Sequence, residues 1–170
     1  MEHLKEPISR SGTTVSTQSS YIKSNGPFTL YLRKGLFMNY LTFDELVKIF
    51  RLQSSMDHLM AIPELNSNRT EKIGNLSGGI KKLIELLTLL YTEGNYVLLD
   101  EPFSYLSPVL VEKLIPHIKR QSEKKGIILT DHQYQYVWST ANKYYILYDG
   151  RLKEIYESNE LERFGYLTQQ

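Results

Sequence analysis

The chain has 170 residues, 41% of them hydrophobic and 23% charged, which is typical of one ordinary globular domain. Its 20 basic and 19 acidic residues leave a formal net charge of +1, and no run of lysines or arginines forms a footprint for nucleic acid or lipid. Because there is no cysteine, disulfides, thiolate metal sites and a cysteine nucleophile are excluded, and no apolar stretch approaches the roughly 18 residues of a membrane-spanning helix.

The first forty residues carry weak structural signals. Residues 1–20 are polar and rich in serine and threonine, so they predict no independent element. The run Phe28–Leu32 follows a proline and predicts a short strand.

A helix is predicted to begin at Thr42. Thr42 and Glu45 form a T-x-x-E capping box, and Leu41 and Leu46 occupy the flanking positions of a hydrophobic staple. The apolar residues that follow recur at the spacing of one helix face, which supports the same prediction.

The middle of the chain predicts buried elements. A second, shorter helix is expected over residues 55–60, and a polar loop over residues 66–75 separates it from a long apolar helix over residues 80–91. Tyr96–Leu99 is a continuous β-type run followed by two carboxylates. It predicts a central parallel strand covered on both faces.

The last third of the chain predicts a βαβ unit and a hairpin. A helix from about Pro108 and a strand at Gly126–Thr130 follow the central strand, so we expect a partly parallel sheet with a right-handed crossover. Tyr144–Tyr148 and Leu152–Tyr156 flank an Asp-Gly pair, which is typical of a tight hairpin turn. The last dozen residues predict a short helix.

Three short motifs carry the chemistry, and the first is LSGG at residues 76–79, directly before the long apolar helix. A serine followed by two glycines at a helix start exposes backbone N–H groups and the positive end of the helix dipole, which suits a phosphate. Taken alone, these four residues are more simply an N-cap with a glycine-rich turn.

The second motif is LLDEP, residues 98–102, at the carboxyl end of the predicted central strand. Ligands collect at that edge of an open α/β sheet, where an aspartate can hold Mg²⁺ and a neighbouring glutamate can polarise water. Standing alone, Asp100 and Glu101 could equally begin a solvated turn.

The third motif is TDH, which ends in His132 and follows the next predicted strand. The topology places this histidine beside the carboxylates, where an imidazole could hydrogen-bond a terminal phosphate. A lone histidine is usually structural, and we assign His3, His58 and His117 to that class.

In their order and spacing, the three motifs together resemble the ATP-binding cassette (ABC) ATPases. LSGG matches the family's signature loop, VLLDEPF its Walker B strand with the following glutamate, SYLS its D-loop, and the histidine of LTDH its switch loop. The resemblance extends from about Phe28 to Tyr156. DEPF, the proline after the D-loop and IILTDH are most similar to the subclass that powers lipopolysaccharide export and branched-chain amino-acid uptake.

The resemblance implies a role for each site residue. Asp100 would contribute to Mg²⁺ coordination, Glu101 would be the general base for the attacking water, and His132 would contact the γ-phosphate. The residues that would bind the ATP held by another subunit are Ser77, Gly78 and Gly79.

The resemblance also implies partners and a location. In such ATPases two subunits pack head to tail and complete each other's ATP sites, so that ATP drives dimerisation and hydrolysis lets the dimer open. We therefore expect ATP and Mg²⁺ as cofactors, and a homo- or heterodimer with a second ABC ATPase subunit. This dimer would bind transmembrane permease subunits at the cytoplasmic face of the membrane, and no nucleic acid is expected.

The sequence departs from the family pattern in the phosphate-binding loop. No segment matches G-x-x-x-x-G-K-[ST], whose lysine and backbone make the main grip on the β- and γ-phosphates, so we expect this chain alone to be weak or inactive as an ATPase. Lys34 stands at the Q-loop position, where an ammonium cannot ligate Mg²⁺. Ser107 replaces the usual D-loop aspartate, and Ile80 replaces the polar residue that commonly follows LSGG.

The expected fold is a P-loop NTPase-like (RecA-like) α/β domain, with a largely parallel sheet and an inserted α-helical subdomain, N-terminally truncated. Within a partial cassette over residues 1–170, residues 1–35 would be a remnant of the core up to the Q-loop. Residues 36–84 would be the helical subdomain that ends in the signature loop, and residues 85–170 the C-terminal α/β core. Because the missing segment should supply a central strand and a core helix, we expect marginal stability for the chain alone.

Two alternatives stay open beside a catalytic subunit. A non-catalytic, truncated cassette would only lend its LSGG loop to a partner's ATP. Lys34 and the missing phosphate-binding loop favour this alternative, whereas Asp100, Glu101 and His132 favour a catalytic parent. The soluble ABC ATPases of DNA repair and translation rank lower, because the sequence has neither a long coiled coil nor a second cassette.

Overall fold

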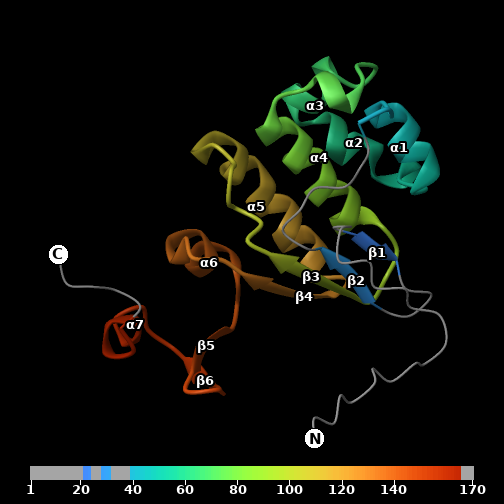
Figure 1. Cartoon of the computed structure of the whole chain (residues 1–170). Helices are drawn as coiled ribbons and strands as arrows, with labels where there is room; N and C mark the ends of the chain where they lie inside the picture. Colours follow the sequence, from blue (N-terminus) through green and yellow to red (C-terminus); the bar gives the residue numbers. More distant parts are fainter. Residues whose placement is uncertain (1–20, 24–27, 32–38, 166–170) are drawn as a thin grey trace, which may run out of the picture.

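The computed structural model of the protein describes residues 21–23, 28–31 and 39–165. Within these ranges a four-stranded sheet has the order β1-β2-β3-β4 (Figure 1). Its strands are β1 (Tyr21–Lys23), β2 (Phe28–Tyr31), β3 (Tyr96–Asp100) and β4 (Gly126–Thr130). β1 is antiparallel to β2, whereas β2, β3 and β4 are mutually parallel neighbours, so the prediction of a largely parallel sheet is confirmed.

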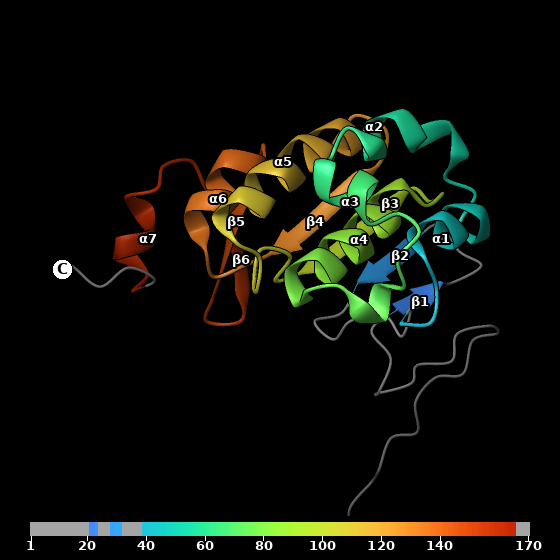
Figure 2. The same ribbon diagram turned by 90° about the horizontal axis from the view of Figure 1, so that it is seen from above.

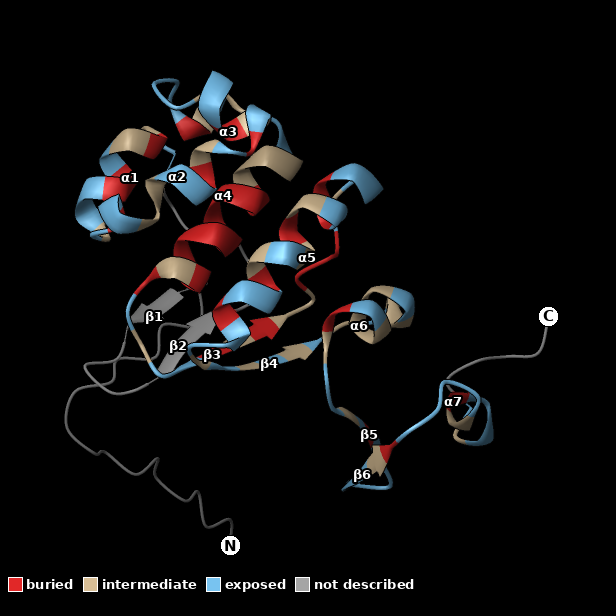
Figure 3. Cartoon of the chain, turned by 180° about the vertical axis from the view of Figure 1, so that it is seen from behind, coloured by how far each residue is buried: buried red, intermediate tan, exposed pale blue. Residues whose placement is uncertain are grey.

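One face of the sheet is covered by two long helices. α4 (Gly78–Tyr91) and α5 (Pro108–Ser122) lie side by side over it (Figures 1 and 3). Val97 and Leu99 alternate along β3 and are buried in the same core as the apolar residues of both helices. α5 connects β3 to β4, which is the predicted βαβ arrangement.

The opposite face of the sheet is less covered. Leu98 of β3 is only half-buried, and its partner in β4, Ile128, is 59% exposed. The prediction that β3 is covered on both faces is therefore confirmed for the face beneath α4 and α5, whereas within the described ranges the other face is only partly covered. A continuous apolar run specifies a strand, but it does not report which layers pack against it.

A group of short helices packs around α4 beyond the sheet (Figure 1). The first, α1 (Phe43–Ile49), begins as predicted, because the Glu45 N–H donates to Thr42 Oγ1 at 3.2 Å and the Thr42 N–H donates to Glu45 Oε2 at 2.7 Å. The remaining elements of the group are the 3₁₀ turn η1 (Gln53–Ser55), α2 (Met56–Met60), α3 (Pro63–Ser67) and the 3₁₀ turn η2 (Ile73–Asn75).

The segment predicted as a polar loop over residues 66–75 is more ordered than its composition indicates. α3 extends into it and η2 ends it, and each element is anchored by one buried side chain, Leu65 and Ile73 respectively. Pro63 at the first helical position is the sequence signal that was missed.

α4 is the central element of the core. Nine consecutive residues of this helix, from Lys82 to Leu90, are buried (Figure 3), as expected of a helix that is surrounded on all sides. One continuous cluster of buried side chains joins the short helices to the sheet through α4. The loop at the start of α4 is therefore attached to the most deeply buried helix of the described chain.

The C-terminal part forms a smaller unit at the end of the molecule away from β1 (Figure 2). It contains α6 (Tyr134–Thr140), β5 (Tyr144–Tyr148), β6 (Arg151–Ile155) and α7 (Glu160–Arg163). β5 and β6 pair antiparallel, and Asp149 and Gly150 have φ values of 49° and 69°, so the predicted Asp-Gly hairpin turn is confirmed. α6 was not predicted. No helix in the described ranges is long and apolar enough to cross a membrane.

Candidate functional site

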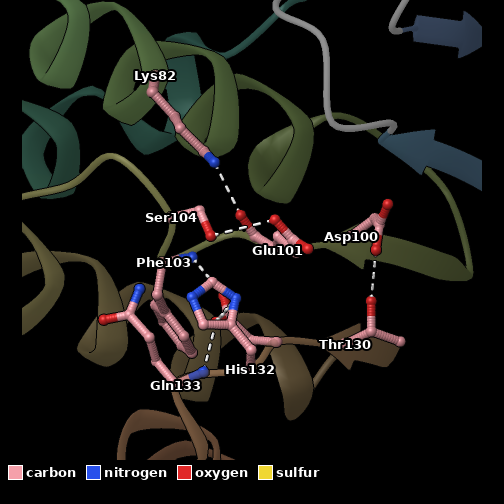
Figure 4. A network of polar contacts seen from close by, with 9 residues as sticks. Lys82, Asp100, Glu101, Phe103, Ser104, Thr130, His132 and Gln133 are labelled. Carbon is pink, nitrogen blue, oxygen red and sulfur yellow. Dashed lines mark hydrogen bonds and ion pairs between the residues drawn. The ribbon is translucent and has the colours of Figure 1, made fainter.

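The carboxyl ends of β3 and β4 meet at one edge of the sheet. Their parallel register pairs Asp100, the last residue of β3, with Thr130, the last residue of β4. The Thr130 hydroxyl donates to Asp100 Oδ1 at 2.7 Å, which holds the half-buried Asp100 carboxylate in place (Figure 4). The sequence-predicted metal ligand is therefore oriented by its neighbour in the next strand.

Glu101 follows β3 in an unusual backbone conformation. Its φ is 48°, in the left-handed region that residues other than glycine rarely adopt. The Glu101 N–H donates to the Thr130 carbonyl at 2.7 Å, and the Ser104 hydroxyl donates to Glu101 Oε2 at 3.3 Å. The first bond fixes the backbone of Glu101 at the sheet edge, and the second orients its carboxylate.

Asp131 joins the turn after β3 to the turn after β4. Its side chain is fully buried, and Oδ2 accepts a hydrogen bond from the Phe103 N–H at 2.9 Å while Oδ1 accepts one from the Gln133 N–H at 2.9 Å. No role for Asp131 was predicted from the sequence. Its position at a strand end, directly before a candidate histidine, was the feature of the sequence that could have indicated a role in the site.

His132 lies in the turn after β4, close to Phe103 and Gln133 (Figure 4). Its side chain is 68% exposed, and Nδ1 is 3.7 Å from Asp131 Oδ1, beyond a direct hydrogen bond. The structure thus brings Asp100, Glu101 and His132 to the same edge of the sheet, as the motif order predicts.

The LSGG segment begins α4 as predicted. Ser77 is the N-cap, and its hydroxyl accepts a long hydrogen bond of 3.4 Å from the Ile80 N–H. The two glycines have different surroundings. A Cβ at Gly79 would lie 3.0 Å from Leu110 Cδ1 of α5, whereas a Cβ at Gly78 would meet nothing within 4 Å. Close packing against α5 therefore favours glycine at position 79, whereas Gly78 has open space in front of it.

Lys82 connects the LSGG helix to the carboxylate turn. Its ammonium donates to the Glu101 carbonyl oxygen at 2.7 Å (Figure 4), although the two residues are 19 positions apart in sequence. This contact between α4 and the turn after β3 was not foreseen from the sequence.

Of the three residues that depart from the family pattern, two lie in the described part of the chain. Lys34 lies outside the described residues. Ser107 occupies the N-cap position of α5 without a side-chain capping bond, and Ile80 is half-buried against the main core.

Asp100 is the candidate Mg²⁺ ligand among the carboxylates at this edge. Among the described residues no group of three histidine, aspartate or glutamate side chains could hold a metal ion. Mg²⁺ usually takes one or two protein carboxylates and completes its shell with phosphate oxygens and water. Asp100 fits that requirement, because its position is set by Thr130 at the ligand-binding edge of the sheet.

Comparison with curated proteins finds ATP-binding proteins of transport systems among the relatives. The chain is 32% identical over 113 residues to a protein described as the probable branched-chain amino acid transport ATP-binding protein LivF of Archaeoglobus fulgidus, a match covering 65% of this chain and 47% of that protein. It is 29% identical over 103 residues to the lipopolysaccharide export system ATP-binding protein LptB of Acidithiobacillus ferridurans, covering 59% and 42%. A match to the thiamine import ATP-binding protein ThiQ of Escherichia coli O157:H7 has 28% identity over 168 residues and covers 95% and 68%. The chain thus spans about half the length of the first two relatives, and no protein family model matches it.

Solved structures support the same fold. The structure of an ATP-binding subunit of an ABC transporter aligns with a TM-score of 0.63 at 18% identity, covering 82% of this chain and 63% of that one. A nucleotide-free ATP-binding cassette of an ABC transporter aligns with a TM-score of 0.61 at 16% identity, covering 81% and 64%. At these identities the likeness concerns the fold, which is that of the P-loop NTPase cassettes.

Proposed function

This chain is related to the ATP-binding subunits of ABC transporters, and from that premise we propose that it binds ATP and takes part in the ATP hydrolysis that drives a transporter. The observation that carries the proposal is that the turns after β3 and β4 are joined by hydrogen bonds at one edge of the sheet. Asp100, Glu101 and His132 come from two neighbouring strand ends, and the buried Asp131 carboxylate ties their two turns together.

Each residue at this edge would have a separate role. Asp100 would bind Mg²⁺, which when bound neutralises charge on the β- and γ-phosphates. Glu101, held by Ser104 and by its strained backbone, would accept the proton of the attacking water. His132, which is exposed at the edge, would donate a hydrogen bond to the γ-phosphate.

The LSGG segment would act on the ATP of a second subunit. The exposed N-terminus of α4, with Ser77 as N-cap and open space in front of Gly78, can offer backbone N–H groups to a phosphate. We therefore propose a head-to-tail homo- or heterodimer of ABC ATPase subunits. The short helices within residues 36–84 would contact a transmembrane permease at the cytoplasmic face of the membrane.

A second candidate function is a cassette that lends its LSGG segment without hydrolysing ATP. The observation in its favour is that no part of the 170-residue sequence matches G-x-x-x-x-G-K-[ST]. A Mg-ATP titration of the purified chain separates the two proposals. Micromolar affinity in the chain alone would contradict the lending role, whereas binding only in the presence of the second subunit would favour it.

Replacement of the general base tests the catalytic proposal. Glu101→Gln keeps the size of the side chain and removes the base, so ATP hydrolysis by the complex isolated with the tagged chain should fall by about 10²- to 10⁴-fold. Nucleotide-dependent association of the subunits should persist, because the amide leaves the LSGG segment unchanged. The control is Glu112→Gln at an exposed position of α5, which should change neither property. Unaltered hydrolysis in the Glu101→Gln variant would refute the role of Glu101.

A further inference from the structure

A buried lysine stands between the LSGG segment and the carboxylate turn. Lys82 is 8% exposed and lies five residues after Ser77 on the same helix. Burying an ammonium is costly unless hydrogen bonds or nearby charges compensate it. Its Nζ donates to the Glu101 carbonyl oxygen at 2.7 Å and lies 5.6 Å from the centroid of the Tyr105 ring, a distance that permits a cation–π interaction.

The turn that Lys82 contacts contains two strained residues. Glu101 has a φ of 48° and Tyr105 a φ of 66°, both in the left-handed region. Such a conformation is energetically costly for a residue other than glycine and persists only where the surroundings enforce it. Lys82 touches both ends of this turn from the direction of α4, while Asp131 holds its middle through the Phe103 N–H.

Lys82 makes a shorter hydrogen bond to the Glu101 carbonyl than the backbone of the turn does. The Ser104 N–H also approaches this carbonyl, but at 3.3 Å, which is a much longer contact than the 2.7 Å bond from Lys82. A charged donor makes the stronger bond of the two. The lysine is therefore well placed to orient the peptide that follows Glu101.

We propose that Lys82 is a positioning residue for Glu101: its ammonium fixes the peptide after Glu101, and with it the direction of the Glu101 carboxylate. Because Ser77, Gly78 and Lys82 belong to the first turns of one buried helix, the same bond links the LSGG segment to the turn that carries the general base. The role of Lys82 in hydrolysis rests on the proposed function of Glu101, whereas the bond itself does not.

The hydrogen bond can be detected directly by NMR on the full chain. Labelling glutamate with carbonyl ¹³C and proline with ¹⁵N selects the two Glu-Pro bonds of the sequence, Glu6-Pro7 and Glu101-Pro102. Lys82→Met should shift the Glu101 signal upfield and leave the Glu6 signal in place. The matched control is Lys81→Met, because Lys81 Nζ donates instead to the Gly74 carbonyl at 2.6 Å, and it should leave both signals unchanged.

Steady-state kinetics test the consequence for catalysis. In the complex isolated with the tagged chain, Lys82→Met should lower kcat for ATP by about 10²-fold, the usual effect of misplacing a catalytic group by about 1 Å, with little change in KM. Lys82→Arg should recover most of the lost kcat, because it retains a long cationic donor. Lys81→Met should resemble the wild type.

The outcomes separate the two proposals. A Glu101 signal that does not move in Lys82→Met, or a variant whose KM rises while kcat is unchanged, overturns the positioning role. If Lys82→Met fails to fold, Lys82→Arg and Lys82→Gln are compared by the same two measurements, and the Glu101 signal must follow the presence of the cation. Absence of ATP hydrolysis in the wild-type complex contradicts the proposed function, and the NMR comparison then still decides whether Lys82 holds the turn.

Discussion

At the scale of single residues, the two adjacent glycines of the LSGG segment have different surroundings. Gly79 faces Leu110 of α5 so closely that an added methyl would be 3.0 Å from it, whereas Gly78 faces open space. Sequence motifs alone present the two glycines as equivalent. The structure gives them different constraints.

This difference leads to a prediction for two alanine variants. Gly79→Ala should have a free energy of unfolding about 1–3 kcal/mol lower than that of Gly78→Ala, because overpacking strains the contact with α5. Its urea denaturation midpoint should be lower accordingly. Gly78→Ala should be at least as stable as the wild type, since alanine is the better helix former. It should nevertheless weaken nucleotide-dependent association, because the methyl occupies the space in front of the N-terminus of α4. Equal stability of the two variants would contradict the packing argument.

At the scale of elements, α4 has hydrogen bonds near both ends to residues from other parts of the chain. Near its N-terminus, Lys82 donates to the turn after β3. At its C-terminus, Lys125, which lies between α5 and β4, donates to the carbonyl oxygens of Leu90 at 2.9 Å and Thr92 at 2.6 Å. These carbonyls are among the groups that a helix end leaves without partners within the helix.

We predict that Lys125→Met lowers the free energy of unfolding by about 1–3 kcal/mol, because two carbonyls near the end of the buried helix lose a charged donor. Lys125 is half-buried, and this burial lowers its pKa, with a smaller contribution from the neighbouring Lys124 charge. The control is Lys124→Met at an exposed position, which should be close to neutral. Chemical denaturation of the three proteins makes the comparison, and equal midpoints would exclude Lys125 as a helix cap.

At the scale of the whole molecule, a histidine between α4 and α5 makes stability depend on pH. His117 Nδ1 is 2.7 Å from the Tyr91 hydroxyl, and burial lowers the pKa of His117, with further lowering by the charges of Arg120 and His58. The folded state therefore binds a proton less readily at this position than the unfolded chain does. Stability contributed by neutral His117 is present above the unfolded pKa of about 6.5 and declines as the pH falls below it.

Thermal unfolding between pH 7.5 and about 5 tests this expectation. The midpoint should fall with decreasing pH in the wild type, and the slope should be reduced in His117→Gln, which cannot take up the proton. His132→Gln is the matched control, because His132 is largely exposed, and it should retain the wild-type slope. An unchanged slope in His117→Gln would assign the pH dependence to other groups.

The elements that the sequence predicted correctly depend on short-range physics. The Thr42 capping box, the apolar period of α4, the β-type runs of β3 and β4 and the Asp-Gly turn each involve residues a few positions apart. The elements that were not predicted depend instead on contacts between distant parts of the chain. α3 and α6 are short helices with weak periodic signals, and their stability comes from packing against the rest of the protein.

By itself, the sequence determined the order of the motifs, the α/β class and the residues that meet at the ends of β3 and β4, because parallel strands bring their carboxyl ends to one edge. Only the tertiary structure decided how those residues are held. The bonds from Lys82 to Glu101 and from Phe103 to Asp131 join positions 19 and 28 residues apart, and no local pattern encodes such contacts. They exist because the packing of α4 and α5 on the sheet brings these residues together, so their chemistry depends on the folded core.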